Sequence, residues 1–496
     1  MTLPENGRSE SPLAARTPLI IAAIGGLVLF IAASLRHWFL RSGGYDLGIF
    51  DQALYLISQG KAPVSSLIGM HMMADHVSLV LYPIGWLYKI FPSVHLLFFL
   101  QTFSLAGGVI PLYYLCRQSN LSRNQAIGLS VAYLLYPVTI FASLFDFNPQ
   151  TLTIPFLLGS IYFARDRKIW AFVACIAMVM ACRDASSLTV IFLGIWLLGF
   201  EKRRLAGAIA IVTGIAWFVI TSKFISPAFV APGTVSTVDS IIIRNYGYLG
   251  SSFGEILKNI FFRPDLWIGQ LFQKSVIRYL AVLIIPLVWG LSPRHLAPMV
   301  GALPTLAMNI LAVQPNFRDL KYYYDLPILV FIFVALISAM QADRTWIKRG
   351  RTIVLWTCAL IVLGVGARLA TSNIGNNTDS GQFQASREAI QQVRPGGKVL
   401  TTHSLAPQIS QRETIHVYPI EGEYVNVFRQ VDSLKHLVAS VMDVSMYDQI
   451  LLRRPAQLEE SADRTTSALI DQLQTDSRFK LTYDRAGVYL FDQIRR

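Results

Sequence analysis

Residues 45–52, YDLGIFDQ, place two carboxylates, Asp46 and Asp51, directly after the first long apolar segment of the chain. A carboxylate near the apolar boundary of a membrane protein is either an ordinary interfacial charge or a group held there for chemistry. This stretch also marks the point at which the chain would first leave a bilayer. The sequence on either side is needed to distinguish an interfacial charge from a functional group.

The composition is that of a membrane protein. Of the 496 residues, 53% are hydrophobic and 15% are charged, and the mean hydropathy is +0.47. A soluble globular protein of this size has a lower apolar fraction and more charge. The net charge of +13 does not indicate nucleic-acid binding, because the Lys and Arg residues form short clusters between apolar runs. We therefore expect a lipid bilayer around the chain and no nucleic-acid partner.

Apolar runs of roughly 17–25 residues specify transmembrane helices, because only helices and closed barrels satisfy their backbone in lipid. We predict a polytopic α-helical membrane protein of about eleven spans. The expected spans are residues 17–37, 94–116, 124–142, 151–164, 169–182, 185–200, 205–222, 277–291, 295–313, 324–340 and 352–370.

The basic residues predict the topology. If residues 1–16 form a cytoplasmic leader, the clusters of Lys and Arg fall in alternate loops on the cytoplasmic side. The opposite loops, including 36–93 and 222–275, then lie outside. This divides the chain into a transmembrane domain, 17–372, and an extracytoplasmic domain, 373–496.

The two long outer loops are expected to be more than linkers. After YDLGIFDQ, apolar residues at helical spacing stop at Gly60 and predict a short amphipathic helix on the membrane surface. Residues 74–91 are apolar, aromatic and interrupted by proline, which suits a helix at the interface. The second loop, 222–275, contains the aromatic stretch RNYGY at 244–248; a long loop without secondary structure is usually functional or disordered.

From about residue 373 the composition becomes that of a soluble domain. Helices are predicted over 382–393 and 465–476, and short strands over 398–402, 415–418 and 449–452. Residues 479–483 and 488–491 predict a hairpin. Helices mixed with strands indicate a small α/β domain.

A transferase at a membrane surface needs only a few parts. A lipid-phosphate sugar donor presents an anionic leaving group, and the acceptor hydroxyl loses its proton as it attacks the anomeric carbon. A partly desolvated carboxylate takes that proton, and Arg or Lys, with or without a divalent cation, holds the phosphate. An acid soon after the first helix, with cations on the same face, supplies these parts.

Several separated motifs resemble one family. They are YDLGIFDQALYLISQG, ADHVSLVLYPIGWLYKIFPS, QTFSLAGGVIPLYYLCR, FDFNPQTLTIPF, LPTLAMNIL followed by KYYYDLPI, and HSLAPQISQRETIHVYP. With these motifs the chain resembles the DUF2079 family of bacterial membrane proteins, which is similar in turn to the GT-C superfamily of polyprenyl-phosphate-sugar-dependent glycosyltransferases. The resemblance implies a GT-C-like protein of the bacterial inner membrane that moves a sugar from a polyprenyl-phosphate donor to an extracytoplasmic acceptor.

The resemblance also implies Asp46 as the general base, since GT-C enzymes are similar in having a catalytic Asp or Glu in the first outer loop before an amphipathic helix. Alternatively, Asp46 caps that helix. Asp51 is five residues on and points away from Asp46 on a helix. It is either a substrate-binding residue or part of a solvated face.

A metal site is the next hypothesis. Some GT-C enzymes use a divalent cation such as Mg²⁺ or Mn²⁺, and Asp46 and His76 are the candidate ligands here. His71 and His76 are five residues apart, so they do not share a helix face as ligands four apart do. His76 is alternatively a partner of the substrate or of Asp46.

The other outer loops hold further candidates for binding substrate. Asp146 and Asn148 lie where family members often have a His-Pro-Glu-like sequence; here Asn-Pro-Gln at 148–150 lacks the ionisable pair, which leaves hydrogen bonding to sugar. Arg183 and Asp184 form an ion pair with each other or bind phosphate. The remaining candidates for phosphate or sugar are Arg244, Tyr246, Arg318, Lys321 and Tyr322.

Two other classes of function stay open. A lipid or sugar transporter needs a path through the bundle, usually marked by polar or broken helices in corresponding halves. A non-catalytic receptor or assembly protein that works through its C-terminal domain would tolerate loss of Asp46 and not loss of residues 403–411.

Overall fold

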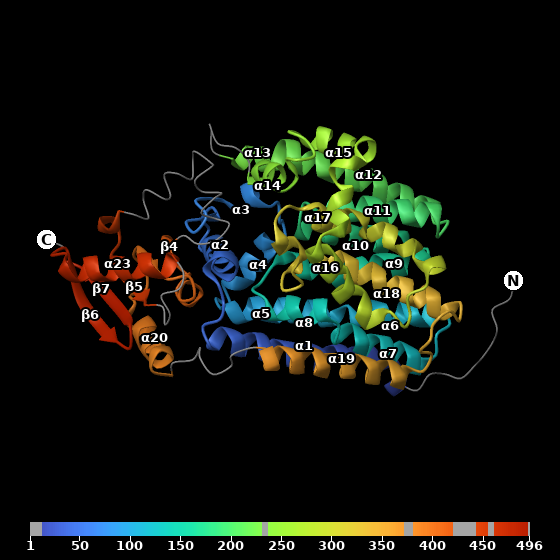
Figure 1. The fold of residues 1–496 in the computed structure, drawn as a ribbon, viewed down its shortest axis with the longest axis horizontal. Coiled ribbons are helices and arrows are strands. Elements are labelled where there is room, and N and C mark those ends of the chain that lie inside the picture. Colours follow the sequence, from blue (N-terminus) through green and yellow to red (C-terminus); the bar gives the residue numbers. More distant parts are fainter. Residues whose placement is uncertain (1–11, 231–236, 372–379, 420–442, 455–460, 495–496) are drawn as a thin grey trace.

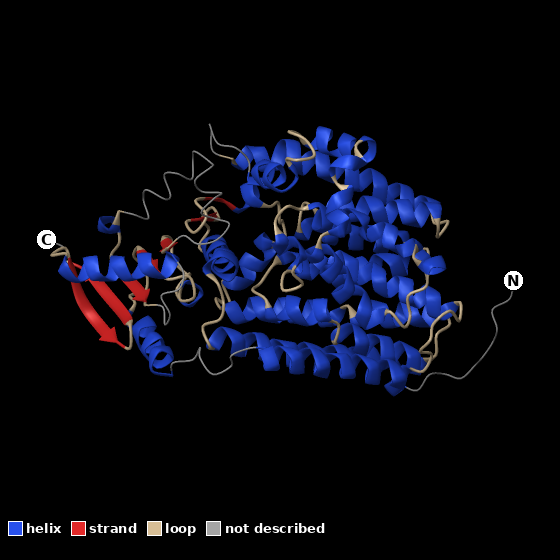
Figure 2. Ribbon diagram, viewed as in Figure 1, coloured by secondary structure: helices blue, strands red, loops and turns tan. Residues whose placement is uncertain are grey.

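The structure is a computed structural model that describes residues 12–230, 237–371, 380–419, 443–454 and 461–494. Helices form a large body, and all strands except a short pair lie in a smaller C-terminal unit (Figures 1 and 2). Most of the expected leader, 1–16, falls outside the described residues, as do residues 373–379 at the expected domain boundary.

The helical body contains α1 (Pro12–Trp38), α2 (Ile49–Ser58), α3 (Met72–Asp75), α4 (Leu81–Tyr88), α5 (Val94–Gly107), α6 (Val109–Gln118), α7 (Arg123–Leu134), α8 (Pro137–Leu144), α9 (Ile154–Arg165), α10 (Ile169–Cys182), α11 (Ser186–Gly199), α12 (Arg204–Ile220), α13 (Ser226–Phe229), α14 (Thr237–Tyr246), α15 (Phe253–Phe262), α16 (Lys274–Ile284), α17 (Leu303–Leu311), α18 (Leu326–Gln341) and α19 (Gly350–Thr371).

In the described part of the chain, four helical segments are long and apolar enough to cross a membrane: Arg16–Trp38, Val94–Gln118, Arg204–Phe229 and Tyr323–Gln341. Two further pairs qualify only when joined across a bend, of 44° between α7 and α8 and of 65° between Pro264–Phe272 and Lys274–Leu287. The first bend lies at Pro137, the first residue of α8. Proline bends the helix here because it lacks the N–H that would form a helical hydrogen bond. Each of the eleven expected spans overlaps a helix, and their number stays a prediction.

The core of the body is built around α18. Fourteen residues of this helix are buried, and its side chains pack into one continuous apolar cluster with α5 to α12. Fully burying a side chain such as Leu329 contributes about 2 kcal/mol. At the edge, α19 packs on α7 so tightly that a Cβ at Gly350 would lie 1.8 Å from the carbonyl oxygen of Asn124.

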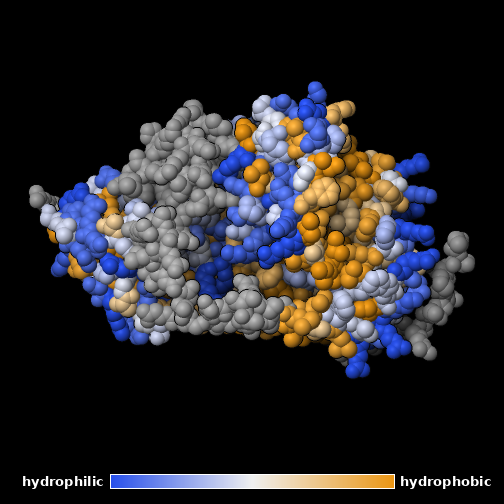
Figure 3. All heavy atoms as spheres, viewed as in Figure 1, coloured by the Kyte–Doolittle hydropathy of each residue, from blue (hydrophilic) through white to orange (hydrophobic). Residues whose placement is uncertain are grey.

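Apolar residues form a broad band over the helical body, with hydrophilic residues beyond it at the end opposite the C-terminal unit (Figure 3). Loops expected on the cytoplasmic side meet at that end. Arg165 forms an ion pair with Glu201 over 2.7 Å, and Gln125 donates to the carbonyl oxygen of Lys348 over 2.9 Å. Loops that carry basic residues thus contact one another, and the side of the membrane on which they lie stays a prediction.

The long loops are more structured than expected. Residues 222–275 contain α13, α14, α15 and the short helices Pro264–Leu266 and Ile268–Phe272, although 231–236 lie outside the described residues. The expectation of a loop without secondary structure is therefore wrong. In the first loop, α2 is present and ends before Gly60, whose φ is +72°. Helix α2 is covered by protein, because nine of its ten residues are buried. It is therefore not the helix on the membrane surface that the sequence predicts.

The C-terminal unit is a mixed five-stranded sheet in the order β4-β3-β5-β7-β6. Its elements are α20 (Ser380–Gln392), β3 (Val399–Thr401), β4 (Ile415–Val417), β5 (Gln449–Arg453), α23 (Ser461–Thr475), β6 (Phe479–Arg485) and β7 (Val488–Gln493). β3 runs parallel to β4 and β5, and β7 runs antiparallel to β5 and β6. These helices and strands match those predicted from the sequence to within four residues at each end.

One apolar cluster joins this unit to the loop between α1 and α5. Leu47, Leu54 and Leu67 from the loop pack in the same core as Leu405 and Val417 from the C-terminal unit. The other face of the sheet has its own core with α23, around Ile450 and Ile470. Shared burial of apolar surface therefore fixes the C-terminal unit on the end of the body that carries YDLGIFDQ.

Candidate active site

Asp46 lies in a tight segment against which the C-terminal unit packs. It belongs to η1 (Gly44–Gly48), a single turn that continues into α2, and its side chain is partly buried. Gly44 allows the close approach, because a Cβ there would lie 3.0 Å from the side chains of Ala406 and Val417. Gly43 and Gly44 thus give a backbone without side chains before Tyr45 and the carboxylate.

Several charges act on Asp46. Burial and then the negative charge of Asp146 raise the pKa of Asp46 from 3.8 to about 7. The cations of Arg36, Lys321 and Arg183 act in the opposite direction. A carboxyl group with a pKa near the working pH is partly ionised and still basic enough to take a proton, which suits a general base.

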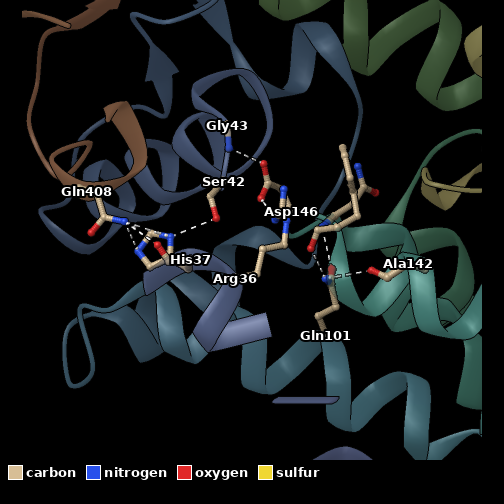
Figure 4. A network of polar contacts seen from close by, with 10 residues as sticks. Arg36, His37, Ser42, Gly43, Gln101, Ala142, Asp146 and Gln408 are labelled. Atoms are coloured by element: carbon tan, nitrogen blue, oxygen red, sulfur yellow. Dashed lines mark hydrogen bonds and ion pairs between the residues drawn. The ribbon is translucent and has the colours of Figure 1, made fainter. Parts of the chain in front are cut away.

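Asp146 joins three parts of the chain. It lies in the loop after α8, is 3% exposed, and its Oδ1 accepts a hydrogen bond from Nη1 of Arg36 at the end of α1 over 2.6 Å (Figure 4). Its Oδ2 accepts from the backbone N–H of Gly43 over 2.7 Å. Asp146 therefore neutralises Arg36 and anchors the segment that carries Asp46.

The loop that holds Asp146 is itself braced by α5 (Figure 4). The amide of Gln101 donates to the carbonyl oxygens of Ala142 and Phe145, over 3.1 and 3.0 Å, and accepts from the backbone N–H of Asn148 over 3.1 Å. The side-chain oxygen of Asn148 accepts from the backbone N–H of Gln150 over 3.0 Å. These bonds satisfy a buried turn and fix the position of Asp146.

Arg183 and Asp184, between α10 and α11, meet His76. Nη2 of Arg183 lies 2.9 Å from Nε2 of His76, and Nδ1 of His76 lies 3.7 Å from Oδ1 of Asp184. Arginine has no acceptor, so Nε2 of His76 accepts this bond and the ring proton is on Nδ1, facing Asp184. Burial acts to raise the pKa of Asp184, but His76 and Arg183 together lower it.

The guanidinium of Arg183 also lies 5.1 Å from the centre of the Tyr323 ring and 3.5 Å from the side-chain oxygen of Asn148. Lys321 reaches the same region from the loop before α18, since its charge acts on Asp46. Its ammonium lies 5.8 Å from the centre of the Tyr322 ring. Two cations from different loops thus face one carboxylate beside aromatic rings.

Three other candidates belong to a different cluster. Arg318 is buried and donates to the carbonyl oxygens at the end of α17, over 2.6 Å at Ala312. The hydroxyl of Tyr246 donates to the carbonyl oxygen of Met308 over 3.0 Å, and Nη2 of Arg244 lies 3.4 Å from Oε1 of Gln314. These contacts brace the residues around the end of α17.

Two expectations for YDLGIFDQ are wrong. Asp46 does not cap α2, which starts at Ile49 after Gly48 with no side-chain capping bond. Asp51 is not on a solvated face: it is 1% exposed and accepts hydrogen bonds from Tyr88, Ser410 and Gln411, over 2.6, 2.5 and 3.0 Å. The C-terminal unit covers the helix face that the local sequence pattern leaves open.

The expected metal ligands are not arranged as a metal site. Across the described residues, no three His, Cys, Asp or Glu side chains come together as ligands would. Nε2 of His76 already accepts from Arg183, whose positive charge next to it disfavours a cation. Asp46 and His76 therefore do not fit a shared divalent cation.

The sequence predictions missed two residues beside Asp46. One is Arg36, which reads locally as the charged end of the first span. The other is His403, whose backbone oxygen accepts a hydrogen bond from the N–H of Gly44 over 3.1 Å. The motif that contains His403 is visible in the sequence, but no periodicity or spacing links it to a residue near position 44.

The pattern of one protein family, described as a predicted membrane protein (DUF2079), matches residues 36–490. The chain belongs to the DUF2079 family. The match begins at Arg36 and ends in β7, so it includes the helical body from the end of α1 onward and most of the C-terminal unit of this DUF2079 protein. No curated protein matches the sequence.

Two crystal structures of ArnT from Cupriavidus metallidurans have a similar fold. One is bound to undecaprenyl phosphate, with a TM-score of 0.54 at 12% identity, and the other is in the apo state, with a TM-score of 0.52 at 13% identity. In both comparisons 95% of the DUF2079 chain and 98% of the ArnT chain are covered. The likeness therefore extends over nearly the whole fold.

Proposed function

We propose that this DUF2079 protein is a GT-C-like glycosyltransferase that moves a sugar from a polyprenyl-phosphate donor to an acceptor, with Asp46 as the general base. The observation that carries the proposal is one carboxylate with a pKa of about 7 that faces Arg36, Arg183 and Lys321. The fold shared with ArnT, crystallised with undecaprenyl phosphate, supports a lipid of the same class here.

The donor phosphate would lie against Arg183 and Lys321, whose charges act on Asp46. Arg36 is paired with Asp146, whereas Arg183 and Lys321 contact His76 and aromatic rings. A guanidinium binds phosphate oxygens with two parallel N–H bonds, and an ammonium adds a point charge. We assign phosphate binding to Arg183 and Lys321, and the positioning of Arg183 to His76, Asn148 and Asp184.

Transfer then needs one bond to form and one to break. The acceptor oxygen attacks the anomeric carbon, and the bond from that carbon to the phosphate oxygen breaks. Polyprenyl phosphate leaves with the electron pair, stabilised by Arg183 and Lys321, and Asp46 takes the acceptor proton. All these groups lie in connections between helices, which is where a rigid scaffold often carries its binding and catalytic residues.

The proposal includes a location. The site residues come from loops that the basic clusters predict to be on the outer face, and the basic clusters meet at the opposite end of the body. We propose a multi-pass protein of the bacterial inner membrane, with the site and the C-terminal unit extracytoplasmic and about eleven spans.

The test is transfer of radiolabelled sugar by the purified full chain in lipid nanodiscs. A panel of undecaprenyl-phosphate-linked sugars serves as donors, and a bacterial membrane extract supplies acceptors. Asp46→Asn should lower the rate by about 10²–10⁴-fold, the contribution of a general base. The control is Asp265→Asn, since Asp265 is an exposed partner of Arg263. Equal rates in wild type and Asp46→Asn would remove Asp46 from the reaction, and no transfer by wild type would refute the function.

A further inference from the structure

The C-terminal unit reaches the segment that carries Asp46 through one histidine. His403 follows β3, and its carbonyl oxygen accepts the hydrogen bond from the N–H of Gly44. Its ring lies 5.4 Å from the ring of Tyr45, centre to centre. An imidazole from the far end of the chain thus lies beside the residues that immediately precede the proposed base.

The missing side chain of Gly43 shows where the imidazole points. A Cβ at Gly43 would lie 2.5 Å from Nε2 of His403 and 3.3 Å from Oδ2 of Asp146. Both polar atoms therefore lie against the backbone of Gly43. A side chain at position 43 would require the imidazole to shift.

His403 and Asp46 share their electrostatic surroundings. The charges of Asp146 and Lys321 act on both residues. Burial, with the ammonium of Lys321, lowers the pKa of His403, and Asp146 acts against this. The ring is therefore neutral near pH 7, and one of its nitrogens, Nδ1, is buried without a hydrogen-bond partner among the described residues.

A neutral imidazole next to a carboxylate suits neutral hydroxyl groups better than a phosphate. It can donate to or accept from a hydroxyl group and carries no charge to attract an anion. The cations that fit a phosphate, Arg183 and Lys321, come from the helical body and not from the C-terminal unit. His403 is therefore the group near this segment that the C-terminal unit contributes.

We propose that His403 binds the acceptor, holding its hydroxyl group beside Asp46, so that the C-terminal unit forms the acceptor half of the site. His403 hydrogen-bonds to the acceptor and does not take its proton, which goes to Asp46. The inference rests on the proposed glycosyl transfer and adds the residue that selects the acceptor.

The experiment compares four variants of the full chain in nanodiscs. His403→Ala removes the ring, and His403→Gln keeps a hydrogen-bonding group. His416→Gln is the matched control, because His416 is also buried in the C-terminal unit but its Nδ1 lies 2.9 Å from the hydroxyl of Tyr447. The double variant Ser410→Ala, Gln411→Ala weakens the docking of the unit without touching His403.

Two quantities separate the roles: the Kd for undecaprenyl phosphate, and the KM for membrane extract as acceptor in the transfer assay. His403→Ala should raise the acceptor KM about tenfold, the effect of one lost hydrogen bond, with an unchanged Kd. His403→Gln should restore much of the loss, and His416→Gln should match wild type.

Four results would overturn the inference. If His403→Ala weakens undecaprenyl phosphate binding as Arg183→Ala does, His403 belongs to the donor side. If its acceptor KM is normal, or if its kinetic constants equal those of the docking variant, His403 has only a structural role. If wild type transfers no sugar at all, the proposed function is wrong and so is the inference that rests on it. The transfer assay of the wild-type protein identifies this outcome without any variant.

Discussion

Asp146 raises the pKa of Asp46 even though its own charge is held by Arg36 at 2.6 Å. The two carboxylates come from different loops, and neither has a partner in the local sequence that would place them together. Since Asp46 must be deprotonated to act as a base, kcat/KM for transfer should rise with pH through about 7 and then level off.

Asp146→Asn should move that rise to lower pH. The substitution removes the negative charge that opposes ionisation of Asp46 and keeps an oxygen to accept from Gly43. It also frees Arg36, whose positive charge favours the carboxylate form. The measurement is the pH profile of kcat/KM between pH 5 and 9 for both proteins; a shift to higher pH would contradict the assignment.

Asp46→Asn should stabilise the protein at high pH. A carboxyl whose pKa is higher in the folded state than in the unfolded state binds a proton in the folded state between the two values, so stability falls as pH rises from about 4 to about 7. Above that window wild type keeps a buried charge that the variant lacks. Thermal unfolding in detergent should show a higher Tm for Asp46→Asn at pH 8 and no difference at pH 4.

Arg183→Ala should weaken binding of undecaprenyl phosphate by about 10–100-fold, the effect of losing a charge-assisted hydrogen bond. Arg183→Lys should recover only part, because an ammonium cannot bond two phosphate oxygens in parallel. Arg263→Ala is the control, since Arg263 is exposed and paired with Asp265. Equal Kd values for Arg183→Ala and Arg263→Ala would exclude Arg183 from the phosphate site.

Asp51→Ala should destabilise the protein by about 3 kcal/mol, because it leaves buried donors without an acceptor. These donors are the hydroxyls of Tyr88 and Ser410. The C-terminal unit should then become more sensitive to protease, with cleavage near residues 403–415. Binding of undecaprenyl phosphate to protein that remains folded should be normal, and its loss would mean that Asp51 has a direct role in the site.

The grouping of the site loops could be predicted, because charge clusters between apolar runs predict which loops share a side. Asp46, Asp146, Arg183 and Lys321 were all assigned to one face, and the structure brings them together. The helices and strands of the C-terminal unit also follow from local periodicity. The periodicity of apolar residues and the distribution of Lys and Arg can both be read from a single sequence.

The partners of Asp51 and Gly44 could not be predicted. Local pattern shows a carboxylate on one face of a helix, but its burial depends on Ser410 and Gln411, 359 and 360 residues away. In the same way, only the packing of the C-terminal unit brings His403 to the first loop. A single sequence has no period that spans such a distance. The partners of these residues are determined by tertiary packing.

The bond between Ser410 and Asp51 also has a consequence for biosynthesis. A ribosome that adds about 5–20 residues per second needs roughly 20–70 seconds to travel from one residue to the other. Throughout that time the loop with Asp46 is already made and lacks its cover. The first loop therefore meets the C-terminal unit only after Ser410 and Gln411 have been made, so a chain that stops before them should lack the proposed activity.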